Sequence, residues 1–199
     1  EIWRVTLKTI KEFIKKSKSI KANIISIGIA NQRETTILWD KKTGKPVYNA
    51  IVWQDRRTQN ICKNLKKRKL ENSFRKKTGL FIDPYFSATK VKWIFDNVSA
   101  TKKLHKDKRL MFGTIDTFLI WRLTNKKNHL TDATNASRTL MFNINTNKWD
   151  NEILRRLNIP KSILPEVKNS ADYFGKTSKK IVGEEIPINA VLGDQQAAA

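Results

Sequence analysis

The strongest constraint on the fold is a short apolar, largely β-branched run, Ile24–Ala30, in which Ser26 is the polar position. A run of this kind is typical of a strand that is buried on both faces, as in a parallel sheet. The polar residues Asn31-Gln32-Arg33-Glu34 follow directly. Because ligands of α/β proteins bind at the carboxyl ends of strands, these residues are a candidate binding site.

Strand-like and helix-like segments alternate along the rest of the chain. Trp3, Leu7, Ile10 and Ile14 lie four and three residues apart, which predicts an amphipathic helix. The remaining pattern predicts a hairpin turn at 40–44, a helix capped by Asp55, a helix closed by Gly79, a helix capped by Ser87, a helix at 116–123, a strand at 138–144, a helix capped by Asp150 and a strand at 191–192. This order places the chain in the α/β class.

Composition limits the functions that are open to the chain. Its 199 residues, 39% of them hydrophobic, are enough for one packed domain. The single cysteine, Cys62, excludes an internal disulfide framework and a Cys-rich metal site, and it favours a reducing, cytoplasmic location. No apolar run approaches the roughly 18–20 residues of a membrane span.

The net charge of +22 raises the possibility of a nucleic-acid partner. The excess bases gather in three helix-like stretches, 1–22, 56–77 and 102–109, opposite apolar positions. Solvated helix faces and a compositional bias toward lysine account for this pattern. Nucleic-acid binding therefore remains the less favoured interpretation.

Four clusters carry side chains suited to chemistry: Arg33-Glu34, the segment 53–57, the segment 83–87 and the segment 193–196. An adjacent arginine and glutamate offer several donors and two acceptor oxygens, which suits a polyol whose hydroxyl groups both donate and accept. A local ion pair or a helix cap is the alternative for the same two residues.

The aromatic and acidic candidates also have plainer interpretations. Trp53 and Tyr85 are either platforms for a ligand or packing residues. Asp194, at the start of a helix after Gly193, is either an N-cap or a base that accepts a proton from a hydroxyl nucleophile, as in phosphoryl transfer.

Taken together, these clusters resemble the FGGY family of carbohydrate kinases. The resemblance covers nearly the whole chain in one order. The stretches Asn-Gln-Arg-Glu-Thr and Val-Trp-Gln-Asp-Arg-Arg point to members that phosphorylate glycerol rather than larger sugars. The segments that carry the match are 26–36, 48–58, 78–80, 83–87, 90–94, 112–117, 131–139 and 193–197.

The resemblance implies an actin-like, ribonuclease-H-like α/β lobe that is truncated at both ends, with residues 1–199 forming part of an FGGY amino-terminal, substrate-binding domain. It implies transfer of a phosphoryl group from ATP, with Mg²⁺, to a terminal hydroxyl of glycerol. By position, Arg33, Glu34 and Tyr85 would contact glycerol hydroxyls, and Trp53 would pack on the carbons. Asp194 would be the catalytic base, and Gln195 would line the same pocket.

The resemblance also sets expectations for the isolated chain. The family's first strand with its phosphate loop, its second lobe and its adenine site have no counterpart in the sequence, so we expect 1–199 alone to turn over no ATP. The missing strands would lie next to Ile24–Ala30, and their absence would leave a strand edge unpaired and apolar side chains exposed, so we also expect poor solubility. Assembly of several copies of the chain into a homo-oligomer is a further possibility. The alternatives are an FGGY kinase for a larger sugar and a non-catalytic basic protein that binds nucleic acid or acts as a scaffold.

Overall fold

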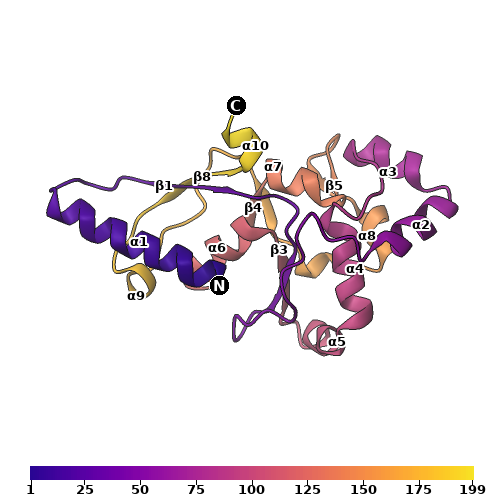
Figure 1. Ribbon diagram of the computed structural model, residues 1–199, viewed down its shortest axis with the longest axis horizontal. Coiled ribbons are helices and arrows are strands. Elements are labelled where there is room, and N and C mark those ends of the chain that lie inside the picture. Colours follow the sequence, from indigo (N-terminus) through magenta and orange to yellow (C-terminus); the bar gives the residue numbers. More distant parts are fainter.

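The computed structural model describes residues 1–199, which form ten α-helices and eight strands (Figure 1). The helices are α1 (Ile2–Ser19), α2 (Gln59–Lys67), α3 (Glu71–Thr78), α4 (Ser87–Asn97), α5 (Ser99–Lys106), α6 (Ile115–Leu123), α7 (Ala133–Ala136), α8 (Asn151–Leu157), α9 (Lys179–Val182) and α10 (Asp194–Ala197). The strands are β1 (Ile27–Asn31), β2 (Ile37–Asp40), β3 (Leu110–Gly113), β4 (Leu130–Asp132), β5 (Phe142–Asn143), β6 (Lys148–Trp149), β7 (Glu166–Lys168) and β8 (Ile188–Gly193). None of the helices combines the length and apolar character that crossing a bilayer requires.

The strands pair in four two-stranded sheets, and the pair that positions the candidate site is β1–β8. These two strands are parallel, although they come from opposite ends of the chain, and Asn31 lies opposite Gly193. Both strands therefore end at the same edge, and the segments that follow them emerge side by side. The other pairs are β2–β3 and β5–β6, which are antiparallel, and β4–β7, which is parallel.

The β2–β3 pair separates two apolar cores. Every residue of both strands is buried. Leu38 and the opposite Phe112 belong to one core, while their neighbours Trp39 and Met111 belong to the other. Because successive side chains of a strand point to opposite faces, one strand pair serves both cores.

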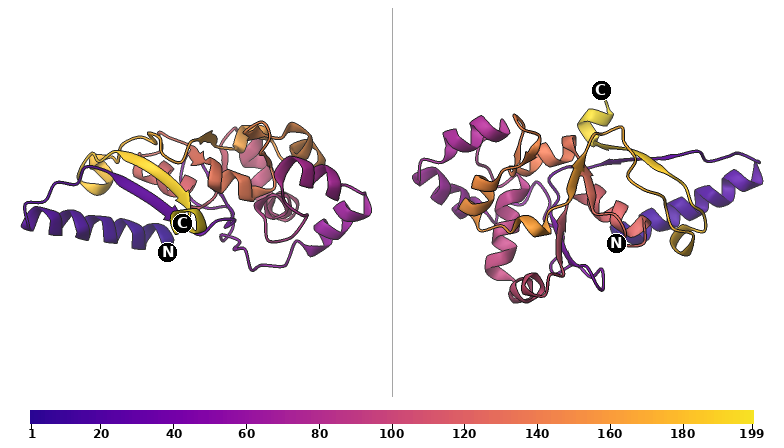
Figure 2. Two further views of the ribbon diagram at one scale, coloured as in Figure 1. Left: turned by 90° about the horizontal axis from the view of Figure 1, so that it is seen from above. Right: turned by 180° about the vertical axis from the view of Figure 1, so that it is seen from behind.

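Two regions of the molecule lie on either side of this pair (Figures 1 and 2). We call α2–α5 and α8 the helical region, whose core cluster contains 21 buried residues. We call α1, α6, α9, β1 and β8 the sheet region, whose core cluster contains 17 buried residues, among them Trp39, Phe118 and Trp121. Helix α1 packs on this second core through Trp3, Leu7 and Ile10.

Several predictions that depend on local chemistry are confirmed. The turn at 40–44 forms with Gly44 at φ 75°, and the Gly44 N–H donates to the Asp40 carbonyl over 2.7 Å. Gly79 ends α3 in the left-handed conformation. The Asp150 carboxylate caps α8 by accepting from the N–H groups of Glu152 and Ile153. The apolar helix at 116–123 forms as α6.

The prediction of a strand over Ile24–Ala30 that is buried on both faces is wrong in two respects. The strand starts only at Ile27, and Ile25 is 81% exposed. Within β1, Ile29 and Asn31 are buried while Gly28 and Ala30 are exposed. Strand β1 has one neighbour, β8, and its other edge is unpaired.

Two predicted caps and one predicted strand are also wrong. Asp55 accepts from the Arg57 side chain instead of capping α2, which begins at Gln59. The Ser87 hydroxyl donates to the Glu34 carbonyl over 3.3 Å and caps no helix. Of 138–144, only Phe142–Asn143 form a strand, because a 3₁₀ turn over Ser137–Thr139 and a left-handed Leu140 (φ 62°) occupy the start.

Candidate functional site

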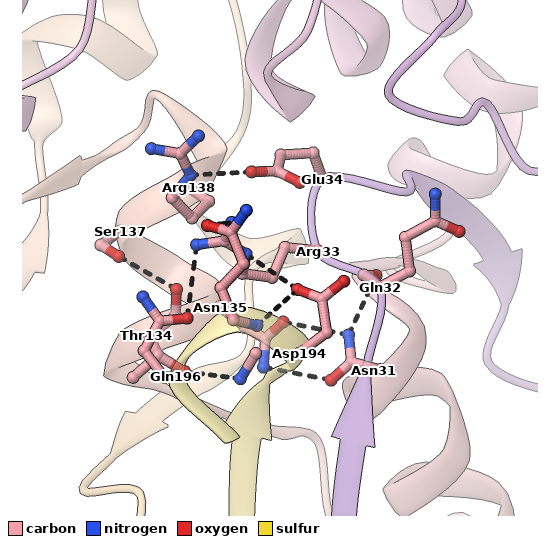
Figure 3. Close-up of polar contacts among 12 residues, drawn as sticks. Asn31, Gln32, Arg33, Glu34, Thr134, Asn135, Ser137, Arg138, Asp194 and Gln196 are labelled. Carbon is pink, nitrogen blue, oxygen red and sulfur yellow. Dashed lines mark hydrogen bonds and ion pairs between the residues drawn. The ribbon is translucent and has the colours of Figure 1, made fainter. Parts of the chain in front are cut away.

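The parallel ends of β1 and β8 bring Arg33 and Asp194 together, 161 positions apart in sequence (Figure 3). Arg33 Nε lies 3.3 Å from Asp194 Oδ1. The arginine side chain is 4% exposed, whereas the aspartate side chain is 52% exposed. The carboxylate is therefore held by a buried cation and still faces the solvent.

The residues after Asp194 hold the other end of the guanidinium. Arg33 Nη2 donates to Gln195 Oε1 over 2.6 Å, and Nη1 donates to Gln196 Oε1 over 3.3 Å. Gly193 makes this approach possible, since a Cβ at that position would collide with Cγ and Cδ of Arg33. The strand-to-helix turn is thus built around the Arg33 side chain.

Glu34 points away from Arg33, and its carboxylate pairs with Arg138 instead. The Glu34 side chain is 2% exposed, and Oε1 accepts from Arg138 Nε over 2.7 Å. Its backbone is left-handed, at φ 61°, which is uncommon for a residue with a side chain. The two neighbours therefore form neither a local ion pair nor a helix cap, and each carries its own oppositely charged partner.

Trp53 and Tyr85 form an aromatic wall beside Glu34. Their ring centroids are 5.4 Å apart, and both side chains are half-buried. The Asp83 carboxylate accepts from the Tyr85 N–H over 2.9 Å, which fixes the turn before α4. The Arg138 guanidinium lies 5.7 Å from the centroid of the Tyr85 ring, so it joins the Glu34 carboxylate to the aromatic wall.

Lys90 lies beneath this wall and is fully buried. Its ammonium donates to the carbonyl of Tyr85 over 2.7 Å and to the carbonyl of Glu34 over 3.0 Å. Burial lowers the pKa of this lysine to about 8, against the attraction of Glu34, Asp55 and Asp83.

A network of polar side chains lies next to the edge where β1 and β8 end. Asn31 and Asn135 exchange side-chain hydrogen bonds of 3.0 and 3.2 Å. The Asp132 carboxylate caps α7 and accepts from the Asn135 amide, and the Thr134 hydroxyl accepts from the Gly193 N–H over 2.8 Å. These contacts connect α7 to the ends of both β1 and β8 (Figure 3).

The structure thus gathers the residues predicted from the sequence into one area in two groups. Arg33, Asp194 and Gln195 form the first group, and Glu34 with Trp53 and Tyr85 forms the second. Sequence reasoning missed Arg138 and Lys90, which connect the second group. Both lie within segments quoted for the family resemblance, but neither has a periodic or spacing signal of its own.

The side chains gathered here are of the types that suit a small polyol. Guanidinium groups donate, ionised carboxylates accept, and aromatic faces cover carbon atoms. The half-exposed Asp194 carboxylate can accept a proton from a bound hydroxyl. No group of three or more His, Cys, Asp or Glu side chains is arranged to hold a metal ion. Mg²⁺ in kinase sites is held by the phosphates of the nucleotide and by water with only one or two carboxylates, so the Mg²⁺ that the resemblance implies does not require such a group.

Comparison with known proteins identifies the family of this chain. The sequence model described as the FGGY family of carbohydrate kinases, N-terminal domain, matches residues 1–199. Glycerol kinase of Petrotoga mobilis is 54% identical over 198 residues, which are all of this chain and 40% of that protein. Glycerol kinase of Staphylococcus epidermidis is 53% identical over 199 residues, again 40% of that protein.

A solved structure agrees with these sequence matches. The crystal structure of Plasmodium falciparum glycerol kinase with ADP superposes with a TM-score of 0.91 at 41% identity, covering 97% of this chain and 39% of that one. Gluconate kinase from Lactobacillus acidophilus, at 22% identity and a TM-score of 0.81, shows the same fold.

The fold is therefore that of an actin-like, ribonuclease-H-like α/β lobe, as the sequence predicted. More particularly, the chain belongs to the FGGY family of carbohydrate kinases. It spans about 40% of the length of the curated relatives that it matches.

Proposed function

We propose that this chain supplies the glycerol-binding part of an ATP-dependent glycerol kinase, which makes glycerol 3-phosphate. The observation that carries the proposal is the Arg33–Asp194 pair at the shared edge of β1 and β8. A buried cation fixes a half-exposed carboxylate there, next to donors and acceptors of polyol type. Relatives at 53–54% identity that are named glycerol kinase support this substrate.

In the proposed reaction Arg33 donates to one glycerol hydroxyl and the Glu34 carboxylate accepts from another. Tyr85 adds a hydroxyl contact, Trp53 covers the carbon chain, and Gln195 lines the pocket. Asp194 takes the proton from the terminal hydroxyl of glycerol. The hydroxyl oxygen forms a bond to the γ-phosphorus of ATP, and the bond between that phosphorus and the oxygen that leaves with ADP breaks. Positioning does most of the work in phosphoryl transfer, so a carboxylate suffices as the base. The ATP supplies the phosphoryl group, and no step is assigned to Mg²⁺.

Glycerol is favoured over a larger sugar. The neighbours named gluconate kinase and xylulose kinase are only 22–23% identical, so they bear on the fold alone. A panel of glycerol, xylulose and gluconate distinguishes these substrates. A DNA titration at increasing salt tests the nucleic-acid alternative, because phosphate contacts give a steep salt dependence.

The proposed partner and the proposed cellular location each rest on one observation. A second lobe from the rest of a kinase polypeptide would supply the nucleotide site, since the chain matches only 40% of its relatives. Cys62 is buried and unpaired, which fits the reducing cytoplasm. Sedimentation analysis of the completed protein would show whether it is a homo-oligomer.

The test is a chimera in which residues 1–199 replace the matching 40% of Petrotoga mobilis glycerol kinase. We expect glycerol-dependent release of ADP by the chimera and none by the 199-residue chain alone. The unaltered Petrotoga enzyme is the positive control, and Lys63→Ala, on the exposed face of α2, is the matched variant control. A well-folded chimera that shows no glycerol-dependent release of ADP, or that prefers xylulose, would refute the proposal.

A further inference from the structure

Among the lysines of the chain, only Lys90 is buried, with none of its surface exposed. Removing a charged amine from water is costly unless nearby groups compensate for the lost hydration. Here two backbone carbonyls do so, those of Glu34 and Tyr85, at 3.0 and 2.7 Å. The lysine thus joins two segments that lie 51 positions apart in the sequence, and each segment carries a residue of the candidate site.

The Glu34 carbonyl accepts hydrogen bonds from three donors, of which Lys90 is one. The Thr36 hydroxyl donates to it over 3.2 Å, from two residues further along the chain. The Ser87 hydroxyl also donates to it, over 3.3 Å, from the start of the same helix as Lys90. Glu34 itself has the left-handed φ of 61°. Such a backbone persists only where surrounding contacts fix it. Helix α4 provides two of those contacts, through Lys90 and Ser87, and these are the ones that come from outside the segment itself.

The nearby carboxylates form ion pairs with arginine side chains and not with Lys90. Asp55 is engaged by Arg57 over 2.7 Å, and Asp83 is engaged by Arg56 over 3.0 Å. Glu34 Oε1 is engaged by Arg138. No carboxylate lies within ion-pair distance of the Lys90 ammonium, so its hydrogen bonds act on the backbone.

We propose that Lys90 is a positioning residue for the substrate: its ammonium ties the Glu34 carbonyl to the Tyr85 carbonyl, so that the Glu34 carboxylate and the Tyr85 ring face the same glycerol molecule. This inference rests on the proposed function. Lys90 does not touch the substrate and acts through the two backbone segments that it joins.

The first measurement needs no substrate. Hydrogen exchange is compared for the folded chimera and its Lys90→Met variant, which keeps the side-chain length and loses the donors. We expect faster exchange at residues 33–36 and 85–87. The control is Ile94→Ala, which removes a buried apolar side chain one helical turn further along α4. It should leave those two segments at the exchange rate of the unaltered chimera.

The second measurement separates positioning from simple loss of stability. In the active chimera, Lys90→Met should raise the KM for glycerol about tenfold while kcat changes less than about threefold, since hydrogen bonds that fix the substrate contacts are lost. Lys90→Gln, which keeps two N–H donors, should restore part of the lost affinity. Ile94→Ala should leave KM unchanged.

The two measurements fail in different ways. An active chimera in which Lys90→Met and Ile94→Ala have the same KM would overturn the positioning role. A folded chimera without glycerol phosphorylation would overturn the proposed function, and with it the role of Lys90 toward glycerol.

Discussion

The helical region and the sheet region differ in how completely they are packed. The helical region encloses its core between α2, α3, α4 and α8. The sheet region leaves large apolar side chains in solvent along α1 and directly after it, with Val5, Phe13 and Ile20 between 54% and 66% exposed. Its strand β1 also has an unpaired edge. One region is closed on itself, and the other is open along one side.

The candidate site lies where these two regions meet, and each contributes a different property. The ends of β1 and β8 contribute the charged groups Arg33 and Asp194. The segments around α4 contribute the aromatic wall and the buried Lys90. The open region thus carries the Arg33–Asp194 pair of the candidate site, and the closed region carries its aromatic wall.

The largest expected effect concerns the chemistry of the sheet region. In the chimera, Asp194→Asn should lower kcat roughly 10³-fold with little change in the KM for glycerol, because the proton acceptor is lost. Trp53→Ala should instead raise KM. Steady-state kinetics measures both, with Asp172→Asn as a control. A kcat for Asp194→Asn within tenfold of the unaltered value would contradict the prediction that the sheet region supplies the proton acceptor.

The next effect tests whether the two regions unfold separately. Phe74 of α3 is 1% exposed within the helical core. Phe74→Ala should cost about 3–5 kcal/mol of unfolding free energy, because it leaves a cavity. Native-state hydrogen exchange should show lost protection in α2–α4 and retained protection in β1 and β8. Equal losses in both regions would mean that they unfold as one unit.

A smaller effect appears as a pH dependence of stability. The folded pKa of Lys90 is about 8, below the ordinary lysine value of 10.5, so the unfolded chain binds the proton more tightly. Stability should therefore rise by about 3 kcal/mol as the pH increases from about 8 to about 10.5. Denaturant titrations of the unaltered protein and Lys90→Met measure this slope, which the variant should lack. Parallel slopes for both proteins would contradict it.

The smallest effect on stability concerns the open side. Phe13→Lys on α1 should change the free energy of unfolding by less than about 0.5 kcal/mol, since Phe13 is 61% exposed, but it should reduce aggregation. The matched control is Phe81→Lys in the helical region, where the phenylalanine is 55% exposed. Light scattering should distinguish the two variants. An equal gain in solubility from both would remove the distinction between the regions.

Features set by near neighbours in the sequence were predictable. The Asp150 cap depends on N–H groups two and three residues away, and the Gly79 helix end depends on one φ angle. The meeting of Arg33 and Asp194 was also predictable, because parallel strands end at a common edge.

Other features depend on partners that no local pattern reveals. Arg138 binds a carboxylate 104 positions away, and Lys90 binds a carbonyl 56 positions away. The Ser87 hydroxyl has a similar distant acceptor, which explains why it caps no helix. The apolar run at Ile24–Ala30 shows that the segment favours a strand, but it does not show how many neighbours that strand has.

The shared wall of β2 and β3 limits how this protein can change. Leu38 and Trp39 face opposite cores, as do Phe112 and Met111. Inserting or deleting one residue in either strand would reverse the facing of every side chain beyond that point, and it would exchange the contents of both cores at once. Tolerated changes here should thus be swaps of similar volume, and a displacement on one face of the wall should be transmitted to the other.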